Sequence, residues 1–125
     1  MGYEDEHPIF SKADTAANEV VLSFIKMPAA YKEVYGREIC RKIGLCGSYL
    51  DTARYKGNKQ EKLRCLNTAD GYLSEVKYWV NRSTNLFYYT KTGAKRFSIP
   101  PKRAAACYSA LVELGCLIGG WKGSL

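Results

Sequence analysis

Four stretches of this chain carry apolar residues at every third or fourth position, and this spacing restricts the fold more than any other feature. Such spacing places the apolar side chains on one face of an α-helix. No β-strand pattern extends over more than a few residues. The chain is therefore predicted to be all-α, with its helices in an antiparallel up-down four-helix bundle. The last stretch, residues 104–121, has the stripe Ala104, Cys107, Leu111, Leu114 and Ile118 and ends in Trp121.

The first predicted helix begins at Ser11 and runs to about Lys26. Ser11 and Asp14 fit a capping box, in which the two side chains bond to exposed N–H groups of the first turn. Residues 1–10 are predicted to be a flexible acidic leader, and residues 11–125 to form the four-helix bundle domain. The inward-facing residues of this helix are expected to be Ala17, Val20, Val21 and Phe24.

Pro28 interrupts the helical pattern, because proline lacks an N–H group and its ring clashes with the preceding turn. The apolar spacing nevertheless continues across Pro28 to Tyr31 and Val34, so a kinked but continuous helix is one alternative. We favour a break at Pro28, followed by a short turn that ends near Gly36.

Two further helices are predicted, one from Arg37 to about Lys56 and one from about Lys59 or Gln60 to Asn81 or Ser83. Gly57 is expected to end the first of them in the left-handed conformation that is typical of helix C-termini. The inward residues of the first are Ile39, Ile43, Cys46, Leu50 and Ala53. Those of the second are Leu63, Leu66, Ala69, Leu73, Val76 and Val80.

Residues 85–102 form the least regular segment of the sequence and are predicted to contain no extended strand. Thr92 and Gly93 indicate a turn. The pair Pro100 and Pro101 suits the N-terminal boundary of the last helix, because proline is tolerated in the first turn.

Glycine is unusually frequent inside the predicted helices. Each such glycine costs about 1 kcal/mol relative to alanine, and the usual compensation is the close approach of another backbone. Gly119 and Gly120 would also suit the end of the last helix. Close helix–helix contacts are expected at Gly44, Gly47, Gly115, Gly119 and Gly120.

The chain has a net charge of +7, and this charge is unevenly distributed. A basic body favours a polyanionic partner or an acidic protein surface. The alternative is a solvated surface that only improves solubility. Between residues 77 and 103 there is no Asp or Glu, and the basic residues there are Lys77, Arg82, Lys91, Lys95, Arg96, Lys102 and Arg103.

Some of the basic residues are candidate contacts to nucleic acid or to a protein partner. Those in the predicted helices lie off the apolar stripes, and two others lie in the irregular segment. Arginine matches the geometry of phosphate and carboxylate groups, and tyrosines between the cations, such as Tyr88 and Tyr89, would stack on unpaired bases. The candidate interface residues are Arg37, Arg41, Arg54, Lys77, Arg82, Lys95 and Arg96.

The sequence contains no recognisable catalytic or metal-binding motif. Residues 90–95 lack the first glycine of a P-loop, and the single histidine, His7, cannot supply the ligands of a di-iron bundle. Asp70 and Glu113 could meet inside the bundle, but two carboxylates alone are weak grounds for an active site. We expect no enzymatic activity, no cofactor and no metal.

The cysteine pattern and the hydropathy indicate the compartment. The five cysteines are an odd number without a C-x-x-C pair, and they are expected to be buried, reduced thiols. Reduced thiols favour a cytoplasmic location. No apolar run reaches the length of a membrane span, so neither a transmembrane helix nor a membrane partner is expected.

Two stretches of the sequence resemble a known family. One is the pattern of leucine, alanine, aspartate and aromatic residues at positions 66–80. The other covers residues 113–122, where the most specific positions are Glu113, Gly115, Gly119, Gly120 and Trp121. Both resemble the accessory variability determinant (Avd) proteins of diversity-generating retroelements. That family belongs to a four-helix-bundle superfamily that includes proteins encoded by 23S ribosomal RNA intervening sequences.

The resemblance implies a non-enzymatic protein that binds a reverse transcriptase and its template RNA and so enables mutagenic cDNA synthesis and retrohoming. It also implies a homo-oligomer, expected to be a pentamer. The five positions above are interpreted as residues of helix–helix contact and oligomer packing. The alternative is an intervening-sequence-type bundle of unclear role, a general basic nucleic-acid-binding module.

Overall fold

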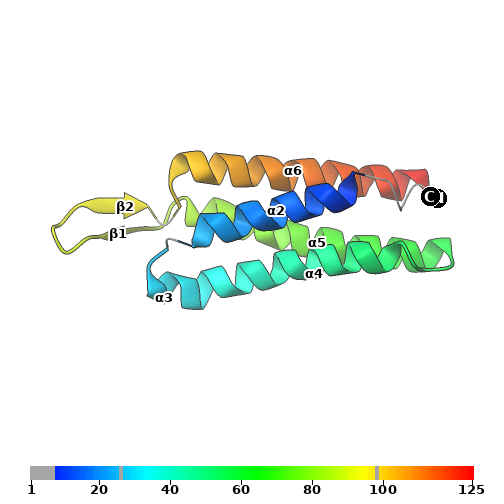
Figure 1. Ribbon diagram of the computed structural model, residues 1–125, viewed down its shortest axis with the longest axis horizontal. Helices are drawn as coiled ribbons and strands as arrows, with labels where there is room; N and C mark the ends of the chain where they lie inside the picture. The colour runs from blue at the N-terminus through cyan, green and yellow to red at the C-terminus, as the bar shows by residue number, and fades with distance from the viewer. Residues whose placement is uncertain (1–7, 26, 98) are drawn as a thin grey trace.

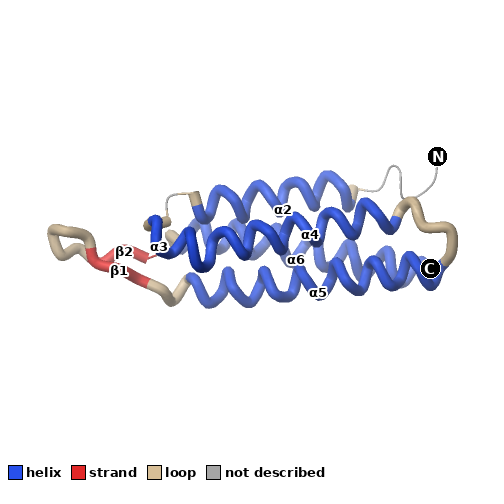
Figure 2. Tube along the Cα trace, turned by 90° about the horizontal axis from the view of Figure 1, so that it is seen from below, coloured by secondary structure: helices blue, strands red, loops and turns tan. Residues whose placement is uncertain are grey.

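Four long helices and one small β-hairpin make up the fold. The computed structural model of the chain describes residues 8–25, 27–97 and 99–125. The long helices lie side by side along the long axis of the molecule (Figures 1 and 2), and we refer to them as the helical body. The prediction of an all-α chain is correct at this level. The helices are α2 (Ile9–Phe24), α4 (Arg37–Ala53), α5 (Lys59–Ser83) and α6 (Pro101–Ser124).

Helix α2 begins two residues earlier than predicted, and the capping box at Ser11 is wrong. Pro8 precedes the first helical residue, and the Ser11 hydroxyl donates a hydrogen bond of 2.9 Å to the Pro8 carbonyl oxygen. Ile9 is fully buried, and the ring of Phe10 lies 5.9 Å from that of Trp121. These two residues belong to the helical body because they bury apolar surface in it. Residues 1–7 of the predicted leader lie outside the described residues.

The predicted break at Pro28 is confirmed, and the segment after it ends at Gly36 as predicted, but this segment is helical and continues into α4. Pro28 has extended backbone geometry, with ψ at 146°, and it precedes a continuous helical run. This run consists of α3 (Ala29–Tyr31), the π-helical turn η1 (Lys32–Gly36) and then α4. Tyr35 anchors the run, since its ring lies 5.5 Å from that of Trp79 on α5.

In the connection between α4 and α5, a side chain caps the start of α5, and the predicted glycine cap at the end of α4 is not formed. Helix α4 ends at Ala53, and Gly57 does not have the left-handed conformation predicted for it. The Asn58 side chain accepts a hydrogen bond of 2.9 Å from the backbone N–H of Glu61. This is a helix N-cap, and it satisfies one of the unpaired donors of the first turn of α5.

The segment predicted to be irregular contains an antiparallel hairpin of β1 (Phe87–Tyr89) and β2 (Lys95–Phe97). Its loop turns at Gly93, which has a φ of +85° and donates a backbone hydrogen bond to Thr90. The predicted turn is therefore confirmed. The strands were missed because three residues each are too few to show an alternating pattern. The hairpin joins the end of α5 to the start of α6 and projects beyond the helical body (Figure 1).

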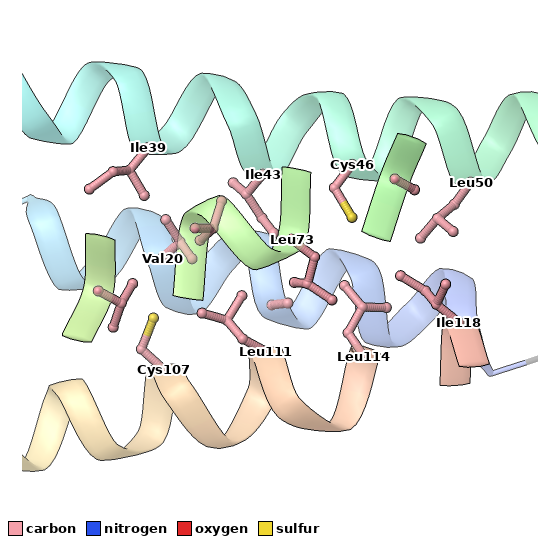
Figure 3. Close-up of a cluster of buried hydrophobic side chains, with 14 of the residues drawn as sticks. Val20, Ile39, Ile43, Cys46, Leu50, Leu73, Cys107, Leu111, Leu114 and Ile118 are labelled. Atoms are coloured by element: carbon pink, nitrogen blue, oxygen red, sulfur yellow. The ribbon is translucent and has the colours of Figure 1, made fainter. Parts of the chain in front are cut away.

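The apolar stripes predicted for two helices meet in the core (Figure 3). Every predicted inward residue of α4 is buried, and so are those of α6, including Trp121. Three predicted inward positions of the other stripes are not fully buried. Ala17 of α2 is partly buried and packs against the core. Val21 of α2 is 46% exposed, and Leu63 of α5 is only half-buried, whereas its neighbour Cys65 is in the core.

The helical glycines make fewer close contacts than predicted. A Cβ atom added at Gly44, Gly47, Gly119 or Gly120 would meet no atom of the neighbouring helices within 4 Å, so the predicted contacts are absent there within the described chain. Helix α6 also continues past Gly120 to Ser124 and does not stop at the glycines. At Gly115 an added Cβ would lie 3.0 Å from Lys77 Nζ and 3.4 Å from Leu73 Cδ2, so α5 approaches this glycine through side chains and not through its backbone.

The five cysteines are all free thiols, and they differ in how deeply they are buried. Cys46, Cys65 and Cys107 are buried, Cys40 is partly buried, and Cys116 is exposed, which corrects its predicted burial. Desolvation and, less strongly, the charge of Asp70 raise the pKa of Cys46 to about 12. Burial also raises the pKa values of Cys40 and Cys107.

Helix α6 is long and apolar enough, by length and composition only, to cross a membrane. The core helix of a soluble protein meets the same criteria. One face of α6, from Ala104 to Trp121, is buried against the other helices.

Candidate nucleic-acid interface

The candidate interface residues do not gather on one surface. Arg54 directly follows α4 and lies near its connection to α5. Lys95 and Arg96 lie on the hairpin, at the opposite end of the molecule (Figure 1). A single interface that uses all of the predicted cations is therefore not available to one chain.

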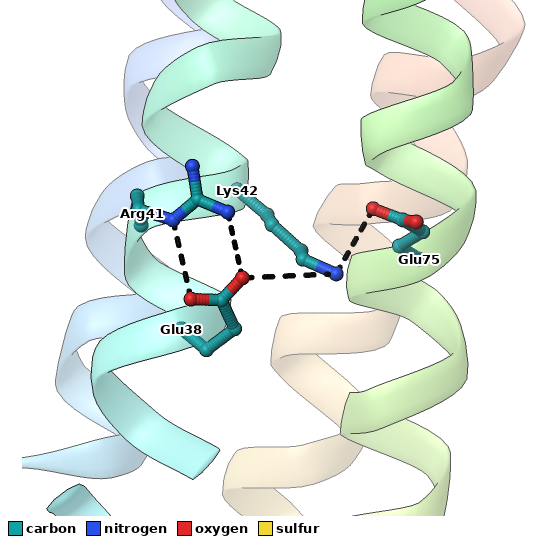
Figure 4. A network of polar contacts seen from close by, with 4 residues as sticks. All are labelled: Glu38, Arg41, Lys42 and Glu75. Carbon is teal, nitrogen blue, oxygen red and sulfur yellow. Dashed lines mark hydrogen bonds and ion pairs between the residues drawn. The ribbon is translucent and has the colours of Figure 1, made fainter. Parts of the chain in front are cut away.

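Two of the predicted arginines have acidic partners on their own helical run. Arg37 lies 3.6 Å from Glu33. Arg41 holds Glu38 through two hydrogen bonds of 2.7 and 3.2 Å, and Lys42 links Glu38 to Glu75 of α5 (Figure 4). The hydrogen bond from Arg41 lowers the pKa of Glu38, so the carboxylate stays charged. These pairs offset part of the positive charge that a polyanion would meet.

Arg54 is also engaged within the chain. It pairs with Asp51, and its guanidinium group lies 4.4 Å from the centre of the Phe10 ring and 5.1 Å from that of Tyr55. Guanidinium groups bind aromatic faces in this way. We therefore interpret Arg54 as a residue that holds the start of α2 against the end of α4.

The other four predicted cations form no ion pair with any described residue. Lys77 is partly buried beside Gly115 of α6. Arg82 lies in the last turn of α5, and Lys95 and Arg96 lie next to each other on β2. Three of these four are thus at the hairpin end of the molecule.

Two further unpaired cations that are not among the candidates lie in the hairpin loop and shortly after the hairpin in the chain. Lys91 lies in the hairpin loop and Lys102 in the first turn of α6, and both are exposed. Both residues stand in the acid-free run of the sequence, so the signal was present, but only Lys95 and Arg96 were chosen from the irregular segment. We call Arg82, Lys91, Lys95, Arg96 and Lys102 the hairpin cations; none of them forms an ion pair within the described ranges.

Aromatic side chains accompany the hairpin cations. Phe87, Tyr89 and Phe97 are 43%, 65% and 44% exposed. Tyr88 points to the other face of the hairpin, where it is half-buried with its ring 6.4 Å from that of Tyr31. Of the two tyrosines predicted to stack on bases, only Tyr89 is therefore exposed. Phe87 and Phe97 were missed because only the strand register places them opposite each other.

The two carboxylates that could have formed an active site, those of Asp70 and Glu113, are each paired with a lysine. Asp70 pairs with Lys122 and Glu113 pairs with Lys12, each at 3.1 Å, so the two carboxylates do not meet. No group of three or more His, Cys, Asp or Glu residues is placed to hold a metal ion among the described residues. The hairpin end of the molecule presents positive charge and exposed aromatic rings to a ligand.

Comparisons of this chain with protein-family models, with curated proteins and with solved structures found no match. The function is therefore inferred from the residues themselves, from their arrangement at the hairpin end and from the resemblance of residues 66–80 and 113–122.

Proposed function

We propose that this protein is a non-enzymatic accessory protein of a diversity-generating retroelement. It binds the reverse transcriptase and the template RNA and so enables mutagenic cDNA synthesis and retrohoming. The observation that carries RNA binding is the set of five hairpin cations, which have no acidic partner among the described residues and lie in a stretch without Asp or Glu. The assignment to a retroelement and to a transcriptase partner is supported by the sequence resemblance.

The proposed scaffold is an antiparallel up-down four-helix bundle. This topology is supported by the connections between helices, which lie at alternate ends of the helical body. Helix α4 joins α5 at one end, and α5 joins α6 through the hairpin at the other end (Figure 1). The proposed assembly is a cytoplasmic homo-oligomer, expected to be a pentamer, without a membrane partner or a cofactor. Gly119 and Gly120 support a contact between copies, because both are exposed and the space beside them is open.

Phosphate neutralisation explains why the hairpin cations matter. Each Lys or Arg that contacts a phosphate releases condensed counterions, so the affinity falls as the salt concentration rises. Cations already paired with a carboxylate have part of this charge offset. The hairpin cations therefore contribute more to RNA binding than Arg37, Arg41 or Arg54.

The test is co-expression with the reverse transcriptase encoded beside this gene, followed by affinity capture and light-scattering mass. The variants are Arg82→Glu with Lys95→Glu, and the control is Arg64→Glu with Lys59→Glu, which changes the net charge equally on exposed positions of α5 away from the hairpin. We expect the hairpin variant to bind RNA at least about tenfold more weakly at moderate salt. The control should bind nearly as the native protein does.

Other outcomes separate the proposals. A salt-sensitive complex that contains transcriptase, RNA and a homo-oligomer of this chain is the expected result. A chain that binds RNA but never the transcriptase would favour the general nucleic-acid-binding module. A monomer that binds neither would overturn the proposed function.

A further inference from the structure

One face of the hairpin carries three exposed rings and one cation. Side chains two residues apart on a strand share a face. The register pairs Phe87 with Phe97 and Tyr89 with Lys95, so these four side chains occupy the same face, which we call the outer face. Tyr88 and Arg96 form the opposite pair and face toward the helical body, where Tyr88 meets Tyr31.

The rings of the outer face lie close together but do not cover one another. The centres of the Phe87 and Tyr89 rings are 5.9 Å apart, and the ring planes are perpendicular. Lys95 Nζ lies 4.1 Å from the centre of the Phe87 ring and 5.5 Å from that of Phe97. Each ring therefore retains exposed surface, and the Lys95 ammonium group lies beside two of the three rings.

We infer that the outer face binds single-stranded nucleic acid by stacking unpaired bases on Phe87, Tyr89 and Phe97, while Lys95 contacts the phosphate backbone. This inference rests on the proposed function and adds the class of RNA that is bound, which is unpaired RNA. Aromatic rings interleaved with cations are the usual means by which proteins bind single strands without reading their sequence.

The chemistry favours this ligand over a duplex or a protein. In a duplex the bases are stacked on each other, so their faces are closed to protein rings. A protein partner for this face would also meet Lys95 on the face and Lys91 in the hairpin loop, and no acid stands in the sequence between Glu75 and Glu113. A polyanion with aromatic faces complements both features, whereas an apolar protein surface would leave the charges unpaired.

Fluorescence anisotropy with a labelled RNA of roughly 12 nucleotides, and with the same RNA annealed to its complement, tests the inference. Tyr89→Leu combined with Phe87→Leu should weaken single-strand binding by about tenfold or more and leave the salt dependence unchanged. Tyr89→Phe should retain the affinity, because the ring is kept. Lys95→Gln should lower the slope of log affinity against log salt by about one.

Tyr55→Leu is the matched control, since Tyr55 is an exposed ring beside an arginine at the other end of the molecule. It should bind as the native protein does. A measurement on the native chain is independent of any effect of the substitutions on hairpin folding. Photo-crosslinking of RNA that contains 5-bromouracil should yield adducts on peptides covering residues 87–97, and adducts confined to other peptides would overturn the inference.

The outcomes distinguish this inference from the proposed function. The outer face would be rejected as a stacking site if the native protein bound single strand and duplex with equal affinity, or if the double leucine variant bound RNA unchanged. The proposal that the protein binds RNA would remain in either case. Failure of the native protein to bind either RNA would reject both.

Discussion

At the scale of single residues, burial decides what each cysteine can do. The thiolate is the reactive form of cysteine, and burial raises the pKa of Cys46 to about 12, so almost none of the thiolate is present in the folded protein near neutral pH. Cys116 lies on the surface of α6. The same residue type is therefore inert at one position and accessible at another.

We expect iodoacetamide at about pH 8.5 to modify Cys116 in the folded protein and Cys46 only after unfolding in urea. The pKa of Cys46 is higher in the folded protein, about 12, than in the unfolded chain, about 8.5. Burial of the neutral thiol therefore stabilises the fold fully below about pH 8.5, and this stabilisation is lost as the pH rises toward about 12. Mass spectrometry of the digested protein measures the modification. Equal modification rates at Cys46 and Cys116 in the folded state would contradict the burial of Cys46.

At the scale of elements, the hairpin depends on one glycine. Gly93 has a φ of +85°, in the left-handed region that residues with a Cβ adopt at a cost of about 1–2 kcal/mol. This turn lies in the five-residue loop, residues 90–94, between the strands and thereby sets their register. The register in turn places Phe87 opposite Phe97.

Gly93→Val should therefore weaken the hairpin and lower the affinity for single-stranded RNA, whereas Gly93→Asn should be tolerated, because asparagine enters the left-handed region more readily. The thermal midpoint of the helical body should change little in either variant, since the loop lies outside the core. Anisotropy and circular dichroism are the measurements. Unchanged RNA affinity in the valine variant would show that binding does not depend on the hairpin geometry.

At the scale of the whole molecule, the exposed glycines bear on the proposed assembly. An added Cβ at Gly119 or Gly120 meets nothing of the neighbouring helices within 4 Å, so alanine should stabilise α6 of an isolated chain by about 1 kcal/mol at each position. In an oligomer that packs another copy against these glycines, the same methyl groups would block close approach.

We therefore expect Gly119→Ala with Gly120→Ala to lower the light-scattering mass of the assembly without lowering the helix content. Gly71→Ala on α5 is the control, because Gly71 is also exposed with open space beside it. It should leave the mass unchanged. An unchanged mass for the double variant would place the contact between copies elsewhere.

The helices and most of the core follow from the sequence alone, because helical periodicity is a local property. The stripes from Ile39 to Ala53 and from Ala104 to Trp121 were each predicted in full and are buried in full. The ends of helices were less predictable. Pro28 marks a boundary by its own covalent structure. The end of α4 needs no glycine cap, because the carbonyl of Ala53 accepts a hydrogen bond of 3.2 Å from Lys62 Nζ of α5.

Only the tertiary structure decided which cations remain unpaired and which rings share a face. Arg103 pairs with Glu19, which is 84 residues away, and Lys42 reaches Glu75 on another helix. Phe87 and Phe97 become neighbours only through the strand register. The net charge and the apolar stripes are properties of the sequence itself, whereas an interface depends on distances between residues far apart in the chain, and folding sets those distances.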